Sequence, residues 1–301
     1  MQYLNNPTVY RAIAFVLLWN SGFIGAEYGL PYMGTFTLLF VRYAILSLCL
    51  LGYLMVKQEW VLPDQKTLAH TALVGILAHG VWLSCALLAL EANVPAGIVA
   101  LVVALQPLAT GAFSGLVVGE RASLVQWCGL VVGFLGIAIA IGTRLQLNND
   151  ISPFAYFIPF GSVIAITIAS LLQRRRETRS QKTMSLPVTV TLFYQSLATT
   201  LALAIPAVMI EQLQTQWTVP LVTTLSWLIF GVSLGAYSLM WQLLSRLDAT
   251  RVASLFYFGP PVTMVMAWIA FGDIPQLADI VGLFVVVIGV LLVQLSRKRL
   301  G

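Results

Sequence analysis

The chain has 301 residues, of which 59% are hydrophobic and only 9% are charged, and its formal net charge is +5. Soluble domains carry roughly 25% charged residues, so water cannot solvate a folded chain as apolar as this one. The composition therefore excludes a soluble protein and indicates that lipid covers most of the surface. The cations lie in loops between apolar segments and not on one patch, which argues against a nucleic-acid partner.

Apolar segments long enough to cross a bilayer follow one another along the chain. A spanning helix needs about 20 apolar residues, and we take the first apolar segment as such a helix rather than a cleaved signal. The polar stretch 174–186 is predicted to be a cytoplasmic linker between the sixth and seventh helices. Ten membrane helices are predicted in all, over residues 11–30, 34–56, 67–90, 94–118, 124–142, 153–173, 187–210, 221–245, 251–271 and 275–296.

The distribution of lysine and arginine predicts the orientation, because cytoplasmic loops hold an excess of these residues. With the N-terminus placed in the cytoplasm, 14 of the 16 cations fall on the cytoplasmic side. Arg144 falls outside and Arg42 lies within a span. The opposite orientation reverses this ratio. We therefore expect a multi-pass protein with both termini in the cytoplasm.

The chain also resembles itself when it is moved along by 153 residues. This shift superimposes Pro107 on Pro260, Gly119 on Gly272, Glu120 on Asp273, Gly129 on Gly282, and Gly136 on Gly289. Each half contains five predicted helices, an odd number, so the second half must enter the membrane from the opposite side. Inverted repeats of this kind are typical of secondary transporters. The predicted fold is an all-α integral membrane protein of ten helices, with residues 1–147 and 148–301 forming two inverted five-helix repeats around a central cavity.

Short motifs in the first two helices resemble a known family. Trp19-Asn20-Ser21-Gly22-Phe23, Gly29-Leu30 and Arg42-Tyr43 resemble the EamA type of the drug/metabolite transporter superfamily, as do Pro107, Gly119-Glu120-Arg121, Gly129 and Gly136. The resemblance implies a carrier of the bacterial inner membrane, often an exporter of amino acids or other metabolites. One departure is Glu27, where the family often has a lysine. An anion in place of a cation changes which substrates or ions are favoured there.

Two ionisable side chains lie within the first two spans, where charge is costly and so marks a candidate functional site. Arg42 is predicted to lie roughly 10 Å inside the second span, at 1.5 Å per residue. Glu27 lies about one turn from the end of the first. Since a tight hairpin joins these helices, the two side chains are within possible reach of each other. Together they form either a gate or an anchor for a substrate carboxylate or amine, or else a structural ion pair.

A histidine and two prolines are predicted near the middle of the membrane. His79 lies in the third span, close to Trp82, and is either a proton-coupling group or a neutral hydrogen-bonded side chain. Pro107 and Pro260 each free a carbonyl one turn earlier. Corresponding breaks in both halves indicate hinges beside a central site, although each is also explained by a packing kink.

Deep aromatic residues complete the candidate site. A buried tyrosine or tryptophan needs a polar partner, and several together form an amphipathic cavity wall; singly, each is more often a packing residue. The candidate substrate-binding residues are Trp19, Glu27, Arg42, His79, Trp82, Gln106, Tyr194, Tyr237, Trp241 and Tyr257.

The function favoured by these patterns is a secondary transporter that exports small polar or amphipathic metabolites by alternating access. The alternatives are an importer of the same fold, an intramembrane enzyme that acts on lipids, and a channel or scaffold. HExxH, GxSxG and Walker motifs are absent, which disfavours an enzyme or an ATP-driven pump. We expect no cofactor and no metal, and a small-molecule substrate and membrane lipid as partners. A monomer is expected, while the glycines at 111, 115 and 119 permit a dimer.

Overall fold

The computed structural model describes residues 7–118, 124–147, 151–179, 186–244, 246, 252 and 255–297, and these residues form helices and short connections. Their one β-type contact is an isolated bridge between Met33 and Thr215. The helical elements are α1 (Pro7–Gly29), α2 (Thr35–Lys57), α3 (Gln65–Gly75), η1 (Ile76–Val81), α4 (Trp82–Glu91), α5 (Ala96–Val103), α6 (Gln106–Val118), α7 (Leu124–Leu147), η2 (Pro153–Phe157), α8 (Ile158–Arg179), α9 (Val188–Met209), α10 (Val219–Ser226), η3 (Trp227–Ala236), α11 (Tyr237–Leu244), η4 (Phe256–Phe258), α13 (Gly259–Phe271) and α14 (Leu277–Arg297).

Within the described residues, eight helical segments are long and apolar enough to cross a membrane. Several of them join two or three elements, as α3, η1 and α4 do over Gln65–Glu91. Two shorter apolar helices follow, over Phe256–Phe271 and Leu277–Leu292. These lengths and compositions confirm the predicted class, an all-helical integral membrane protein.

Not every sequence-based prediction falls on a described residue. Gly119 and Glu120, which are the first partners in two of the repeat matches, lie outside the described residues. So do positions 180–185 of the predicted linker.

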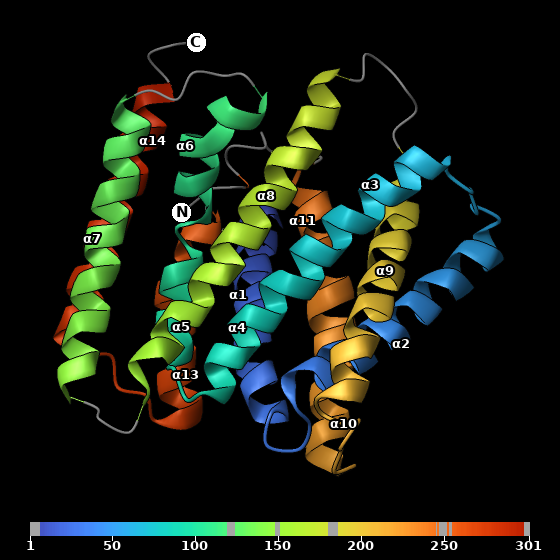
Figure 1. The fold of residues 1–301 in the computed structure, drawn as a ribbon, viewed down its shortest axis with the longest axis horizontal. Helices are drawn as coiled ribbons and strands as arrows, with labels where there is room; N and C mark the ends of the chain where they lie inside the picture. Colours follow the sequence, from blue (N-terminus) through green and yellow to red (C-terminus); the bar gives the residue numbers. More distant parts are fainter. Residues whose placement is uncertain are drawn as a thin grey trace.

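One edge of the molecule is formed by α7 and α14, which lie side by side along their length (Figure 1). Glycines bring their backbones together. A Cβ atom on Gly136 would lie 2.6 Å from the carbonyl oxygen of Gly282, and one on Gly289 would lie 2.6 Å from that of Gly129. Such distances are too short for any side chain, so only glycine permits this close antiparallel contact.

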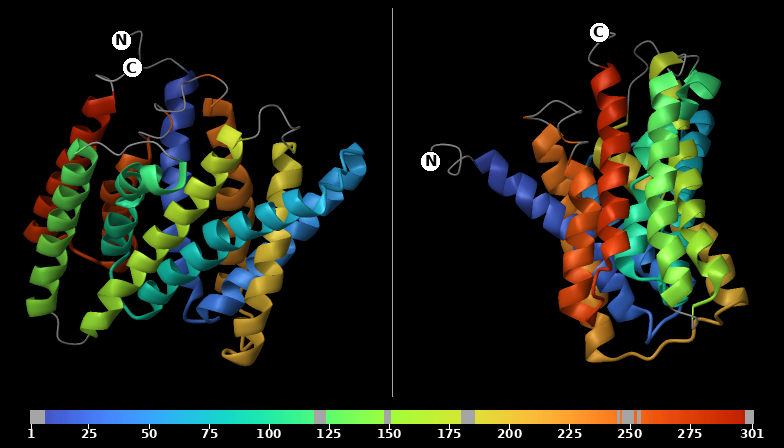
Figure 2. Two further views of the ribbon diagram at one scale, coloured as in Figure 1. Left: turned by 45° about the horizontal axis from the view of Figure 1, so that its top comes forward. Right: turned by 90° about the vertical axis from the view of Figure 1, so that its left-hand side faces the viewer.

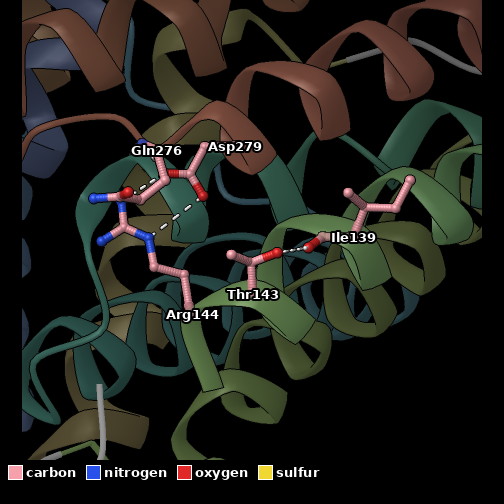
Figure 3. A network of polar contacts seen from close by, with 5 residues as sticks. All are labelled: Ile139, Thr143, Arg144, Gln276 and Asp279. Atoms are coloured by element: carbon pink, nitrogen blue, oxygen red, sulfur yellow. Dashed lines mark hydrogen bonds and ion pairs between the residues drawn. The ribbon is translucent and has the colours of Figure 1, made fainter. Parts of the chain in front are cut away.

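An ion pair joins the same two helices near one end of this edge (Figure 3). Arg144 Nη2 of α7 lies 2.5 Å from Asp279 Oδ2 of α14, and the Asp279 side chain is 2% exposed. The same carboxylate accepts a hydrogen bond from the backbone N–H of Gln276, as in a capping box at the start of α14. The acid thus both caps one helix and binds the other.

The opposite edge holds α2, α3 and α9 (Figures 1 and 2). The start of α2 is capped from another part of the chain. The carboxylate of Glu211, which follows α9, accepts hydrogen bonds from the backbone N–H groups of Phe36 and Thr37 at 2.9 and 2.7 Å. An anion at a helix N-terminus satisfies free N–H groups and complements the helix dipole.

Candidate functional site

Two helical regions are interrupted just before Pro107 and Pro260, the prolines that the 153-residue shift superimposes. The helix before Pro107 ends at Val103, and a new helix, α6, begins at Gln106. In the second half of the chain, the three-residue 3₁₀ segment η4 precedes α13, which begins at Gly259 with Pro260 in its first turn. A proline in the first turn of a helix loses no hydrogen bond, because its missing N–H would have no partner there. The breaks therefore precede the prolines, where the sequence predicted freed carbonyls.

Two other membrane helices contain π-helical segments. The segment η1 interrupts the helix Gln65–Glu91, and η3 interrupts the helix Val219–Leu244. A π-helical segment widens the helix and shifts the side chains that follow it, and it frequently marks a functional site. His79 lies in η1 and Ser233 lies in η3. The hydropathy pattern gives no sign of either segment.

The two helix breaks and the π-helical segment η1 border a cavity of about 200 Å³, which we call the central cavity. Pro107 and Pro260 both line it. Its wall also holds six of the ten predicted binding residues: Trp19, His79, Trp82, Gln106, Tyr237 and Tyr257. A smaller chamber of about 40 Å³ shares Trp19, Phe23, Trp82 and Tyr237 with the central cavity and adds Arg42 and Tyr43.

One tilted and one edge-on aromatic contact hold one wall of the central cavity. The Trp19 ring lies 5.3 Å from the Tyr237 ring and 5.1 Å from the Phe256 ring, measured between centroids. Asn20, on the same helix, is buried and accepts a hydrogen bond from the hydroxyl of Thr263. These contacts fix α1 against α11, η4 and α13, so the aromatic surface is preorganised.

Arg42 is buried, with 5% of its surface exposed, and reaches from α2 to η3. Its Nε and Nη2 atoms donate hydrogen bonds to the Ser233 hydroxyl at 3.2 and 2.9 Å. The guanidinium carbon also lies 5.7 Å from the centroid of the Tyr43 ring, within the range of a cation–π contact.

His79 also makes a hydrogen bond between helices, from η1 to α9. Its Nε2 atom lies 3.3 Å from Oε1 of Gln195 on α9, and its ring packs against Tyr43 and Tyr237 at centroid distances of 5.6 and 6.2 Å. Gln195, Ser233 and Tyr43 were not among the predicted site residues. A sequence signal for one of them exists, because a shift of 153 residues moves Arg42 onto Gln195.

The expected pairing of Glu27 with Arg42 is wrong. Among the described residues, the Oε2 atom of Glu27 is buried without a hydrogen-bond partner. Glu27 lines a different cavity of about 650 Å³, together with Tyr28, Glu91 and Phe271, near the hairpin that follows α1. Arg42 lies two helical turns into α2, whereas Glu27 lies less than one turn from the end of α1, so the two side chains are at different depths.

Two further predicted residues lie away from the central cavity. Tyr194 donates a hydrogen bond from its hydroxyl to the carbonyl oxygen of Val61 at 3.0 Å and packs against Trp60. Trp241 is 43% exposed and does not line the central cavity. Both residues were placed by depth along a span, and depth alone does not say which way a side chain points.

The architecture defines a polytopic helical membrane protein with a cavity lined by several of its helices. A model of the EamA-like transporter family matches residues 7–142 and, a second time, residues 153–295. The chain therefore belongs to the EamA-like transporter family, within the drug/metabolite transporter superfamily. This confirms the resemblance seen in the motifs around Trp19 and Arg42.

Several bacterial transporters are similar to the chain. The uncharacterized transporter YvbV of Bacillus subtilis is 25% identical over 68% of this chain, and the match spans 65% of YvbV. The uncharacterized inner membrane transporter YedA of Escherichia coli is 28% identical over 53% of this chain, a match that spans 49% of YedA. A probable terminal-alkyne amino-acid exporter of Streptantibioticus cattleyicolor is 25% identical, with 98% of this chain and 95% of the exporter covered.

The fold is also that of a protein with a known crystal structure. The two chains superimpose with a TM-score of 0.63 over 97% of this chain and 98% of the other, at 20% sequence identity. Near-complete coverage at such low identity shows that the helical arrangement as a whole is shared.

Proposed function

We propose that the chain is a secondary transporter that exports amino acids or other small polar or amphipathic metabolites across the bacterial inner membrane. In this proposal all ten apolar segments cross the bilayer as two inverted five-helix repeats, residues 1–147 and 148–301. The repeats alternate access to the central cavity, and Pro107 and Pro260 act as hinges. The observation that carries the proposal is how the two halves of the chain share the wall of that cavity.

Equivalent positions of the two halves line the central cavity together. Val103, Ala104, Gln106 and Pro107 are all part of its wall. The residues found 153 positions later, Phe256, Tyr257, Gly259 and Pro260, are part of the same wall. A cavity between two inverted repeats, lined by interrupted helices, is where alternating-access carriers bind their substrates.

Reciprocal contacts between the halves support the inverted arrangement. Gly129 meets Gly289, which is Gly136 shifted by 153, and Gly136 meets Gly282, which is Gly129 shifted by the same amount. When residue i contacts the equivalent of j, and j contacts the equivalent of i, the two elements are related by a twofold axis. The pairs Arg42–Ser233 and Gln195–His79 follow the same rule to within one residue.

The proposed orientation rests on the charges at the two ends of the bundle. Arg11, Lys57, Lys66 and Arg174 lie at the end that holds the start of α1, whereas Glu27, Glu91 and Glu211 lie toward the opposite end. An excess of lysine and arginine favours the cytoplasm. We therefore propose that both termini lie in the cytoplasm.

The proposed substrate class draws on two relatives whose names include amino acids. The Streptantibioticus exporter is one, and the other is a probable amino-acid metabolite efflux pump of Salmonella typhimurium, 20% identical over 88% of this chain. A cavity of about 200 Å³ lies below the roughly 300 Å³ at which pockets for drug-sized ligands begin. Its size and its mixed aromatic and amide wall suit a small metabolite.

A counterflow experiment tests this function. Purified protein in liposomes is loaded with unlabelled amino acids, and entry of a trace labelled amino acid is followed with and without a pH gradient. Saturable exchange above that of protein-free liposomes is expected, together with loss of exchange in Ala104→Leu, which fills the cavity. Absence of saturable flux for amino acids, organic acids and amines alike, with turnover of lipid instead, would overturn the proposal in favour of an intramembrane enzyme.

A further inference from the structure

The wall of the cavity and its adjoining chamber carries one kind of formal charge. Arg42 is the single arginine, lysine, aspartate or glutamate among the described residues that line either space. Arg42 takes no part in the salt bridge of Arg144 and Asp279, which lies at the α7–α14 edge. Arg42 is thus a buried cation without a carboxylate partner in the described part of the chain.

An uncompensated buried cation is costly, so the charge needs a partner that the described residues do not supply. The Ser233 hydroxyl accepts two of the guanidinium's hydrogen bonds but carries no charge. Guanidinium has five N–H donors in a planar fork that matches a carboxylate. Three of them remain beyond those given to Ser233.

A second donor lies in the same wall. The indole Nε1 of Trp82 is buried and has no hydrogen-bond partner among the described residues. Trp82 lines both the central cavity and the chamber that holds Arg42. A buried indole N–H without a partner costs free energy, and a ligand oxygen would satisfy it.

Aromatic rings form the rest of this region. Trp19, Phe23 and Tyr237 line both spaces, and Tyr43 lies under the guanidinium. Such a wall accepts an apolar or aromatic body but offers no anion to a cationic group. His79, in either protonation state, adds no negative charge.

We propose that Arg42 and Trp82 form a carboxylate-binding subsite, so that the cavity selects ligands with a carboxylate on a compact apolar body. This inference rests on the proposed function, since it names the substrate chemistry of the same cavity. The guanidinium binds the carboxylate, the indole N–H donates to one of its oxygens or to a neighbouring acceptor, and the aromatic wall packs against the apolar body. The ligand is held by charge-assisted hydrogen bonds and is released without any covalent step.

Three probes with one hydrocarbon body test the subsite: hydrocinnamate, its neutral amide, and phenylpropylamine. Equilibrium binding to the purified protein in detergent is measured for each. We expect the wild type to bind hydrocinnamate at least about ten-fold more tightly than the amide, since a charge-assisted bond is roughly twice as strong as a neutral one. Phenylpropylamine is expected to bind most weakly.

Variants assign the selectivity to named groups. Arg42→Gln should reduce the preference for hydrocinnamate over the amide to about two-fold or less, and Arg42→Lys should fall between, because lysine keeps the charge but loses the fork. Trp82→Phe keeps an aromatic ring and removes the N–H, so it should weaken hydrocinnamate binding more than amide binding. Arg11→Gln is the matched control, because Arg11 pairs with Gln242 away from the cavity.

The wild-type comparison does not depend on whether any variant folds. Equal binding of the anion and the amide by the wild type, or an unchanged preference in folded Arg42→Gln, would overturn the subsite. Saturable flux of neutral or cationic metabolites with no carboxylate preference would retain the transporter and reject the subsite. Selective carboxylate binding without flux of any compound would retain the subsite and reject the transporter.

Discussion

The α7–α14 edge and the central cavity are built by opposite means. At the edge, two uninterrupted helices touch through glycines, and a buried ion pair joins them (Figure 3). Around the cavity, helices are interrupted by 3₁₀ and π-helical segments, and the helices are joined by neutral or singly charged hydrogen bonds. Close packing without alternatives makes a rigid element, whereas interrupted helices can rearrange at modest cost.

This contrast indicates where a conformational cycle would move the protein. A carrier needs one part that keeps its shape and another that opens and closes around the substrate. The edge has the features of the first part and the cavity wall those of the second. The predictions below test whether the two regions differ in this way.

The largest effect is expected from added volume at the edge. In Gly136→Leu the new side chain meets the carbonyl oxygen of Gly282, a backbone atom that cannot move aside as a side chain does. We expect a cost above the roughly 1–3 kcal/mol of an overpacked core, and almost no folded protein. Gly142→Leu, on the same helix, is the control, since nothing lies within 4 Å of its Cβ. Size-exclusion profiles of fluorescent fusions measure the difference; equal yields would disprove the tight contact.

The next effect is expected from breaking the edge ion pair. Arg144→Met leaves the 2% exposed Asp279 carboxylate without its partner, and removal of one member of a buried pair costs about 3–5 kcal/mol. The apparent Tm should fall by several degrees. The double variant Arg144→Met with Asp279→Leu should recover much of the loss, because no uncompensated charge remains. A double variant less stable than the single would show that the Asp279 carboxylate stabilises the start of α14 through its hydrogen bond from Gln276 even without Arg144.

A smaller structural effect is expected from added volume in the cavity. Ala104 lines the cavity wall, so Ala104→Leu extends into open space and should lower the free energy of unfolding by less than about 1 kcal/mol. Counterflow should nevertheless fall about ten-fold or more, because the substrate volume is occupied. Ala138→Leu, at an exposed position of α7, is the control and should retain both properties. If Ala104→Leu failed to fold, the cavity would tolerate added volume no better than the edge, and the proposed difference between them would be wrong.

The smallest effect concerns Asp273, in the connection before α14 and near the ion pair. Burial raises the pKa of its carboxyl above the ordinary value of 3.8; Arg144 opposes this shift and Asp279 adds to it. The folded state therefore favours the protonated form, and its stability declines as pH rises from the ordinary pKa through the raised one. Asp273→Asn should raise the Tm by roughly 1–2 °C at pH 7, with the gain shrinking toward pH 4. A gain that grew at low pH would contradict the sign of the shift.

Much of the helical pattern followed from local sequence. Hydropathy placed the helices, and the paired prolines indicated where two of them break, because a proline acts on its own helix. Arg42, His79 and Trp82 were selected because polar groups are costly within a span. These signals depend on a residue and its near neighbours, so a single sequence contains them.

Contacts between side chains on different helices could not be predicted from these local signals. Arg42 was expected to meet the acid on the adjacent helix, but its hydrogen-bond partner is Ser233, 191 positions away. Asp279 is 135 positions from Arg144, and the sequence did not predict that these two residues form an ion pair. Helix rotation and depth decide such contacts, and hydropathy reports only one coordinate, the position along the membrane normal. The π-helical segments were missed because they depend on packing rather than composition.

The reciprocal glycine contact of α7 and α14 also bears on how such a chain could originate. A surface in which Gly129 meets the equivalent of Gly136, and Gly136 the equivalent of Gly129, is complementary to an inverted copy of itself. A single five-helix unit with these glycines, inserted into the membrane in both orientations, would already present both halves of the interface. Fusion of two such genes would preserve the contact unchanged and fix the stoichiometry at one to one. The later divergence of Arg42 and Gln195 would then be a specialisation available only after fusion, when the two halves no longer had to share one sequence.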